Sequence, residues 1–156
     1  MKIANIHRPE FVHDEGDPAG YETGYERLGQ KIGGEHLGAS LYEMPPGQSI
    51  CPYHYEYTEE EWLLVLQGSA TVRTPEGEHE LGPGELVCFP IGPQGAHKIT
   101  NKQAEDNLRV IMFSTISKSS IAVYPDSDKI GIYPEDRSDR LIVRRESGVD
   151  YWDRET

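Results

Sequence analysis

Three side chains in one short stretch could together hold a metal ion. They are His54, Glu56 and Glu61, within GQSICPYHYEYTEEEWLLVLQG at residues 47–68. On a β-strand, the spacing of two places His54 and Glu56 on one face and the tyrosines that alternate with them on the other. Imidazole nitrogen and carboxylate oxygen together suit a first-row divalent cation. The same residues also fit an ordinary polar surface, and this stretch alone leaves both interpretations open.

A second stretch, GELVCFPIGPQGAHKITN at residues 84–101, adds His97 among glycines and prolines that are typical of tight turns. Together the two stretches resemble the paired signature motifs of the cupin superfamily. For the first motif (Gly, His-x-His, Glu, Gly), the chain has Gly47, His54-Tyr55-Glu56, Glu61 and Gly68. For the second motif (Gly, Pro-x-Gly, His, Asn), it has Gly84, Pro90-Ile91-Gly92, His97 and Asn101.

The resemblance implies a small β-barrel that binds one divalent transition metal per chain, either zinc, manganese or iron. The residues that match the ligand positions of the family are His54, Glu56, Glu61 and His97. Glu56 is a departure, because the family usually has a second histidine there. The spacing also departs, with one extra residue before His54 and two before His97.

The role of Glu56 stays open at this point. As a fourth ligand it would make the site harder and more anionic than a three-histidine site. Otherwise His54, Glu61 and His97 would form a two-histidine, one-carboxylate triad. Glu56 would then be a catalytic general base, or would accept a hydrogen bond from a ligand. Its neighbours Glu59 and Glu60 are expected to be surface residues.

The fold class predicted is all-β, a cupin jelly-roll barrel (a double-stranded β-helix). The 11 prolines and 16 glycines break the 156 residues into short apolar runs, which favours many short strands. We expect an N-terminal arm at 1–24, the barrel at 25–123 and a C-terminal tail at 124–156. Tyr151 and Trp152 predict that this tail packs on the barrel. The expected core residues are Leu41, Leu63, Val65, Val72, Leu81, Val87, Phe89, Val110 and Met112.

Charge and cysteine content restrict the partners and the compartment. The net charge of −12 argues against binding to nucleic acid or to a membrane surface. The two cysteines, Cys51 and Cys88, are too few for a disulfide scaffold, and the start of the sequence lacks a signal-peptide pattern. We therefore expect a cytoplasmic protein with a small-molecule substrate. Exposed strand edges of a barrel need to be covered, and the N-terminal arm could cover those of a second copy. This favours a homodimer.

Other residues near the motifs have simpler interpretations. The tyrosines of the first motif are expected to pack on the outer face or at a subunit interface, and they are Tyr53, Tyr55 and Tyr57. Three basic residues lie on predicted strands, namely Arg73, Lys98 and Arg109. They could hold an anionic substrate, although a role in solubility explains them equally well.

Three functions fit these observations. The chain is similar to small bacterial single-domain cupins, some provisionally labelled sugar-phosphate isomerases. This resemblance implies a metal-dependent isomerase or epimerase acting on a small polar, sugar-like substrate. The alternatives are a non-haem iron dioxygenase and a small-molecule-binding protein without catalysis, because one fold supports many functions.

Overall fold

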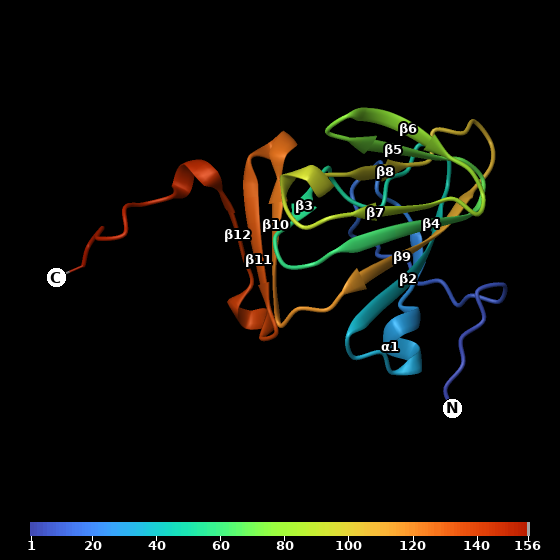
Figure 1. Cartoon of the computed structure of the whole chain (residues 1–156), viewed down its shortest axis with the longest axis horizontal. Coiled ribbons are helices and arrows are strands. Elements are labelled where there is room, and N and C mark those ends of the chain that lie inside the picture. The colour runs from blue at the N-terminus through green and yellow to red at the C-terminus, as the bar shows by residue number, and fades with distance from the viewer. Residues whose placement is uncertain (156) are drawn as a thin grey trace.

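A computed structural model describes residues 1–155 of the chain. The described residues form strands in three antiparallel sheets, with one short α-helix and four 3-10 helices of three residues each, which confirms the all-β prediction (Figure 1). The first sheet has the order β1 (Gly24–Glu26), β2 (Leu37–Met44), β9 (Leu108–Thr115), β4 (Glu61–Gln67) and β7 (Leu86–Phe89). The second has the order β6 (Gly77–Leu81), β5 (Ala70–Thr74) and β8 (Lys98–Thr100).

The main core fills the space between these two sheets. In β4, alternation places Leu63 and Val65 inside, while Trp62 lies outside and is 37% exposed. Six of the nine expected core residues are buried, namely Leu41, Leu63, Val65, Val72, Phe89 and Val110. The other three, Leu81, Val87 and Met112, are partly buried and pack against this core. The arrangement agrees with a jelly-roll barrel.

A third sheet lies across one end of the barrel (Figure 1). Its order is β12 (Leu141–Arg144), β11 (Lys129–Pro134), β10 (Ser119–Tyr124) and β3 (Tyr55–Glu56). Because β3 belongs to the first motif, this sheet joins the C-terminal part of the chain to that motif. The segment 124–156, predicted to be a tail, therefore contains two strands of this sheet, β11 and β12.

The end of the chain departs from the prediction. Tyr151 and Trp152 are 82% and 71% exposed, and the segment after β12 extends away from the barrel (Figure 1). The two rings pack edge-to-face on each other, with centroids 4.7 Å apart. The amide of Trp152 bonds locally to Asp150 Oδ1. The docking expected for these aromatic residues is wrong for the single chain, because the rings pack on each other and the backbone of the segment bonds locally.

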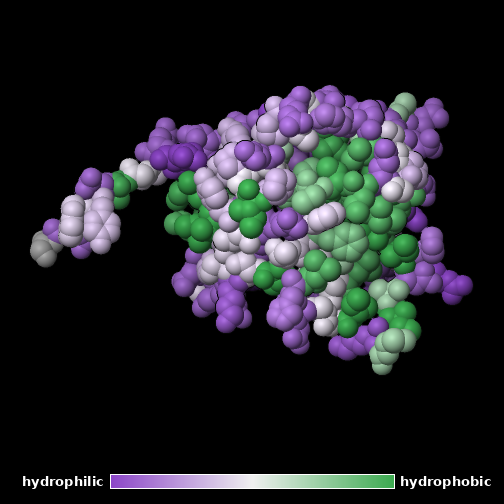
Figure 2. Space-filling model, viewed as in Figure 1, coloured by the Kyte–Doolittle hydropathy of each residue, from purple (hydrophilic) through white to green (hydrophobic). Residues whose placement is uncertain are grey.

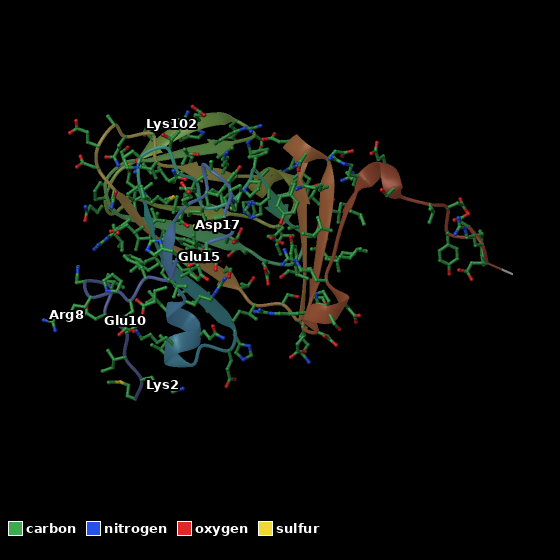
Figure 3. All side chains as sticks on the ribbon, turned by 180° about the vertical axis from the view of Figure 1, so that it is seen from behind. Lys2, Arg8, Glu10, Glu15, Asp17 and Lys102 are labelled. Carbon is green, nitrogen blue, oxygen red and sulfur yellow. The ribbon has the colours of Figure 1, made fainter. Side chains whose placement is uncertain are left out.

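The N-terminal arm and the helix cover the outer face of the first sheet. Ile6 and Phe11 of the arm pack against the cluster of Leu28, Leu41 and Ile111. Leu28 is the first residue of α1 (Leu28–Ile32). Figure 3 shows the arm from behind, with labelled polar residues of the arm on the outside of the molecule. Within residues 1–155, no helix is long and apolar enough to cross a membrane.

Candidate metal centre

A backbone bridge brings the two motifs together. The amide of His97 donates to the carbonyl of His54 over 2.8 Å, and the amide of His54 donates to the carbonyl of His97 over 3.1 Å. The two imidazole rings consequently lie side by side, with centroids 4.8 Å apart. Asn101, the last residue of the second motif, is fully buried and donates to the carbonyls of Met44 and Asp106. This residue therefore supports the loop and not the centre.

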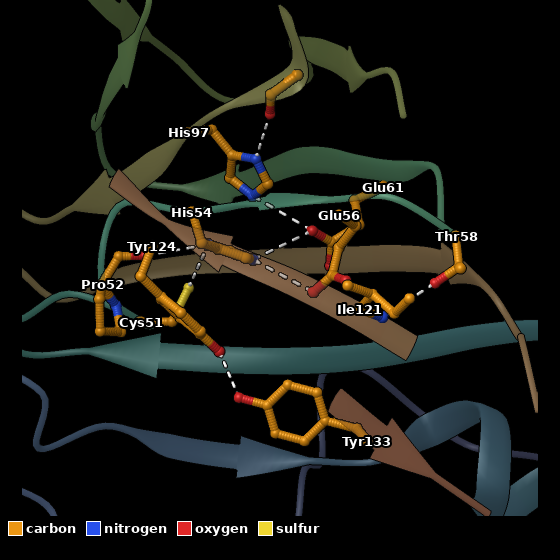
Figure 4. A network of polar contacts seen from close by, with 11 residues as sticks. Cys51, Pro52, His54, Glu56, Thr58, Glu61, His97, Ile121, Tyr124 and Tyr133 are labelled. Carbon is orange, nitrogen blue, oxygen red and sulfur yellow. Dashed lines mark hydrogen bonds and ion pairs between the residues drawn. The ribbon is translucent and has the colours of Figure 1, made fainter. Parts of the chain in front are cut away.

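Glu61 completes a group of three (Figure 4). It is the first residue of β4 and shares the inner face with Leu63. Its Oε2 atom lies 3.5 Å from Nε2 of His54 and 3.5 Å from Nε2 of His97. The ligand atoms of the three residues all lie within 4.8 Å of one another. The structure thus brings together three of the four predicted ligands.

Both histidines are held in the tautomer that a metal ligand needs. Nδ1 of His54 lies 3.0 Å from the carbonyl oxygen of Pro52, and Nδ1 of His97 lies 2.9 Å from that of Gly95. A carbonyl oxygen can only accept, so each Nδ1 carries the hydrogen. Each Nε2 therefore faces the centre, where the neutral form of the ring presents its lone pair.

The donor set needs a positive charge at its middle. Oε2 of Glu61 and Nε2 of His97 are buried and have no hydrogen-bond partner among the described residues. Buried polar atoms without partners are costly, and these atoms present lone pairs to one another. A divalent cation with affinity for nitrogen and oxygen would satisfy them together. The residues therefore fit the metal that the motifs predict.

Glu56 lies beside this triad. Its Oε1 atom is 4.0 Å from Nε2 of His54, and it does not belong to the group of three ligand atoms. Its Oε2 atom is buried without a partner among residues 1–155. Burial, together with the charge of Glu61, raises the pKa of Glu56 to about 7, although His54 opposes the shift. A carboxyl group with this pKa can both accept and return a proton near neutral pH.

The ionisation of the triad is unequal. Burial lowers the pKa of His54, but the Cys51 thiol and the Glu61 carboxylate outweigh burial and raise it to about 11. Burial and the neighbouring His54 lower the pKa of His97 to about 4. Burial raises the pKa of Glu61, but the neighbouring imidazoles of His54 and His97 outweigh burial and lower it. In the metal-free protein a single proton on His54 thus replaces the cation.

This inequality predicts the number of protons that metal binding releases. At pH 8, His54 is protonated, His97 is neutral and Glu56 is mostly ionised. A metal ion needs both Nε2 lone pairs, so its uptake should release about one proton per chain. Calorimetric titration with zinc, in two buffers of different ionisation enthalpy, measures this number. Release of two protons, or of none, would contradict the assignment.

The sequence analysis did not identify two tyrosines that lie close to the centre. The ring of Tyr124 stacks on that of His54, with centroids 6.0 Å apart and an interplanar angle of 23°. Its hydroxyl lies 2.6 Å from that of Tyr133. Both residues come from the third sheet, more than sixty residues after His54. The local sequence SSIAVY at 119–124 has the pattern of a strand, but it does not indicate the strand with which this segment pairs.

The tyrosines of the first motif lie away from the metal centre. Tyr53 and Tyr55 are buried in a cluster with Ala96 and Val123, under the third sheet. Tyr57 is 47% exposed. Their packing role agrees with the prediction. Their location does not, because Tyr53 and Tyr55 are buried within the chain and not on its outer face.

The three basic residues on strands have partners elsewhere. Arg73 forms a two-pronged ion pair with Asp126, and Arg109 pairs with Glu43. Lys98 contacts the hydroxyl of Tyr21. These contacts give no support to an anion-binding role at the metal centre.

A cavity lies beside the centre and not in it. It has a volume of about 750 Å³ and opens between β6 and β7, which are the edges of their sheets. Figure 2 shows a mainly hydrophobic surface in this region, below β5 and β6. Phe89 forms part of its wall and stacks on His97, with ring centroids 3.7 Å apart. The ring of Phe89 therefore separates this cavity from His97 and the metal centre.

Comparison with known proteins agrees with this architecture. The family model of the Cupin domain matches residues 40–114. A protein of Acidithiobacillus ferrooxidans, provisionally described as a sugar phosphate isomerase, has a TM-score of 0.82 and 25% identity, over 93% of this chain and 91% of that one. A cupin-superfamily sugar phosphate isomerase of Silicibacter pomeroyi has a TM-score of 0.80 and 21% identity, over 96% of each chain.

A more distant structure shares the same fold. The polyketide cyclase RemF of Streptomyces resistomycificus has a TM-score of 0.62 and 22% identity, over 75% of this chain and 80% of that one. The comparison with curated proteins gave no match. The family match and the barrel with its histidine–glutamate centre lead to one conclusion: residues 40–114 of the chain form a Cupin domain.

Proposed function

We propose that this cupin is a metal-dependent isomerase or epimerase that acts on a small polar, sugar-like substrate. The observation that carries the proposal is Glu56, a buried carboxyl group with one unpartnered oxygen beside the triad and a pKa of about 7. Isomerases and epimerases of this kind move a proton to and from carbon next to a carbonyl group. Such a reaction needs a base that is partly ionised at working pH.

The residues of the chain divide this work. His54, Glu61 and His97 would hold the ion, which when bound supplies Lewis acidity toward a substrate oxygen. Glu56 would take a proton from the carbon adjacent to the carbonyl carbon. In isomerisation it would return that proton to the former carbonyl carbon, while the hydroxyl proton moves to the former carbonyl oxygen. The Glu56 side chain is only 12% exposed, and this partial burial raises the pKa of its carboxyl group.

The comparison with the Acidithiobacillus ferrooxidans protein supports the same class of reaction. Its description as a sugar phosphate isomerase is provisional, and the two chains share 25% identity along nearly their whole length. That similarity favours a substrate of the sugar class over the polyketide substrate that the name of RemF implies.

Solvent hydrogen exchange tests the proposal without knowledge of the product. Metal-loaded protein is incubated in D₂O with a panel of pentose and hexose phosphates and of the free sugars. We expect proton NMR to show loss of a C–H signal next to the carbonyl group of at least one compound, or its conversion into an isomer. Absence of both exchange and conversion across the panel, with manganese, iron, cobalt and zinc, would contradict the proposal.

A second candidate is a dioxygenase that depends on iron. The observation in its favour is the triad itself, because two histidines and one carboxylate are the donor set of non-haem iron oxygenases. Oxygen uptake separates the two functions. An isomerase turns over without oxygen and with redox-inactive zinc, whereas an oxygenase needs iron and consumes oxygen.

The assembly and location that we propose are a homodimer in the cytoplasm. Exposed apolar residues in the C-terminal segment support the association of two copies, since Val149, Tyr151 and Trp152 are each more than 70% exposed. The free thiols Cys51 and Cys88 support a reducing compartment.

A further inference from the structure

The third sheet presents one continuous face to the metal centre. Glu56 of β3 pairs with Ala122 of β10, and Tyr124 lies two residues further along β10. Gly131 of β11 also pairs with Ala122, and Tyr133 follows two residues later. Directly paired residues and residues two apart share a face in an antiparallel sheet. The side chains of Glu56, Tyr124 and Tyr133 thus lie on the same face.

The two phenols are joined across this face. Their hydroxyl oxygens are 2.6 Å apart, and either one could be the donor (Figure 4). Whichever donates, its partner keeps a hydroxyl hydrogen of its own. The pair therefore retains one donor for a further group, and the bond between the phenols polarises that donor. Burial, the bond to Tyr133 and the nearby charge of Glu56 raise the pKa of Tyr124, so its hydroxyl stays protonated.

Gly131 makes the pairing possible. Tyr133 pairs with Ser120 while Tyr124 pairs with Lys129, so the ring of Tyr133 must extend along the sheet to reach Tyr124. It does so by lying over Gly131. A Cβ atom at Gly131 would stand 2.5 Å from the Tyr133 hydroxyl and 2.6 Å from its ring. Any side chain at this position would displace Tyr133 and break the bond.

One member of the pair lies beside a groove that opens to solvent. Tyr133 lines a groove of about 440 Å³ between the end of β11, the loop at His36 and the segment 116–118 after β9. β9 and β4 are neighbours, and Glu61 at the start of β4 pairs with Ser114 near the end of β9. The groove consequently opens at the barrel end where Glu61 lies, and the Glu61 side chain is 19% exposed.

We propose that the hydrogen-bonded phenols of Tyr124 and Tyr133 form a hydroxyl-binding subsite, which selects substrates that carry a second oxygen beside the one held at the metal. This inference rests on the proposed function and narrows its substrates to hydroxy-carbonyl compounds. Tyr124 also supports His54 through its ring, which a phenylalanine would preserve. Hydroxyl recognition and ring support can therefore be separated by experiment.

The test uses two hydroxamates that differ by one hydroxyl group, glycolohydroxamate and acetohydroxamate. Their binding to cobalt-loaded protein is followed through the visible spectrum of the metal. We expect the wild type to prefer glycolohydroxamate by about threefold to tenfold, the range of one net hydrogen bond. Tyr124→Phe should abolish this preference, and should leave the affinities for cobalt and for acetohydroxamate within about twofold.

Further variants act as controls. Gly131→Ala should also abolish the preference, and Tyr133→Phe should reduce it without any steric change. Tyr57→Phe should retain the preference, because Tyr57 forms a similar phenol pair with Tyr55 away from the centre. A wild type without preference, or a Tyr124→Phe variant that keeps it, would overturn the inference and leave the metal centre standing. Failure of cobalt to bind would overturn the proposed function and the subsite together.

Discussion

Glu61→Ala is expected to lower metal affinity by more than about 100-fold, since even residues that only support a ligand cost 10–100-fold. Oε2 of Glu61 is the single atom that lies 3.5 Å from both histidine nitrogens. Without it, the two imidazoles of His54 and His97 would remain, and the triad would have no anionic ligand. Metal content after dialysis, measured by mass spectrometry, and competition with a chelator give the loss.

Glu60→Ala is the matched control for this prediction. Glu60 is the neighbouring carboxylate, and it accepts a hydrogen bond from the indole of Trp62 on the outer surface. We expect the Glu60 variant to retain the metal. If the Glu60 variant lost the metal and the Glu61 variant kept it, the inward and outward faces of β4 would be reversed.

Glu56→Gln is expected to reduce turnover by about 10²–10⁴-fold, the usual cost of a lost general base, and to leave metal affinity nearly unchanged. The change preserves the shape of the side chain but removes its ability to accept a proton. The pH profile provides a second readout. Turnover of the metal-loaded wild type should fall as the pH drops below the pKa of Glu56, because only the ionised form is a base; the charge of the bound cation should place that pKa below the value of about 7 in the metal-free chain.

Glu56→His separates this role from ligation. A third histidine would restore the set that is common in the family and shift metal preference toward later metals of the series. Competition between manganese, iron and zinc measures that preference in the wild type and in both variants. A strong loss of metal from Glu56→Gln would contradict the base role and make Glu56 the fourth ligand that its position in the motif suggests.

The residues of the metal centre could be predicted because they belong to two short motifs that resemble those of the cupin superfamily. His54 and His97 belong to motifs whose glycines permit unusual backbone conformations. Gly68 has a φ of 83°, and a Cβ there would stand 3.1 Å from the carbonyl oxygen of Asn107. The alternation of β4 then places Glu61 inside with Leu63. Such constraints act over a few residues and are therefore visible in the sequence.

The other half of the site depends on contacts between distant segments. Tyr124 reaches His54 only because β10 pairs with β3, and Tyr133 reaches Tyr124 only because Gly131 leaves space on β11. No spacing within 119–134 indicates that pairing. The exposed position of Trp152 could not be predicted from the local sequence either. An aromatic residue in a polar segment suggests that the ring packs on something, but the local sequence does not identify the residues that it contacts.

The metal content of the untreated protein tests the central claim most directly. The chain is purified without added metal or chelator, and a portion is then incubated with manganese, iron, cobalt, nickel and zinc in turn. Elemental analysis of wild type and of the His97→Ala variant follows, with folding checked by circular dichroism. We predict close to one transition-metal ion per wild-type chain and almost none in the variant. A wild type that stays free of metal after every incubation, or a His97→Ala variant that binds as much metal as the wild type, would contradict the claim that His54, Glu61 and His97 form a metal centre.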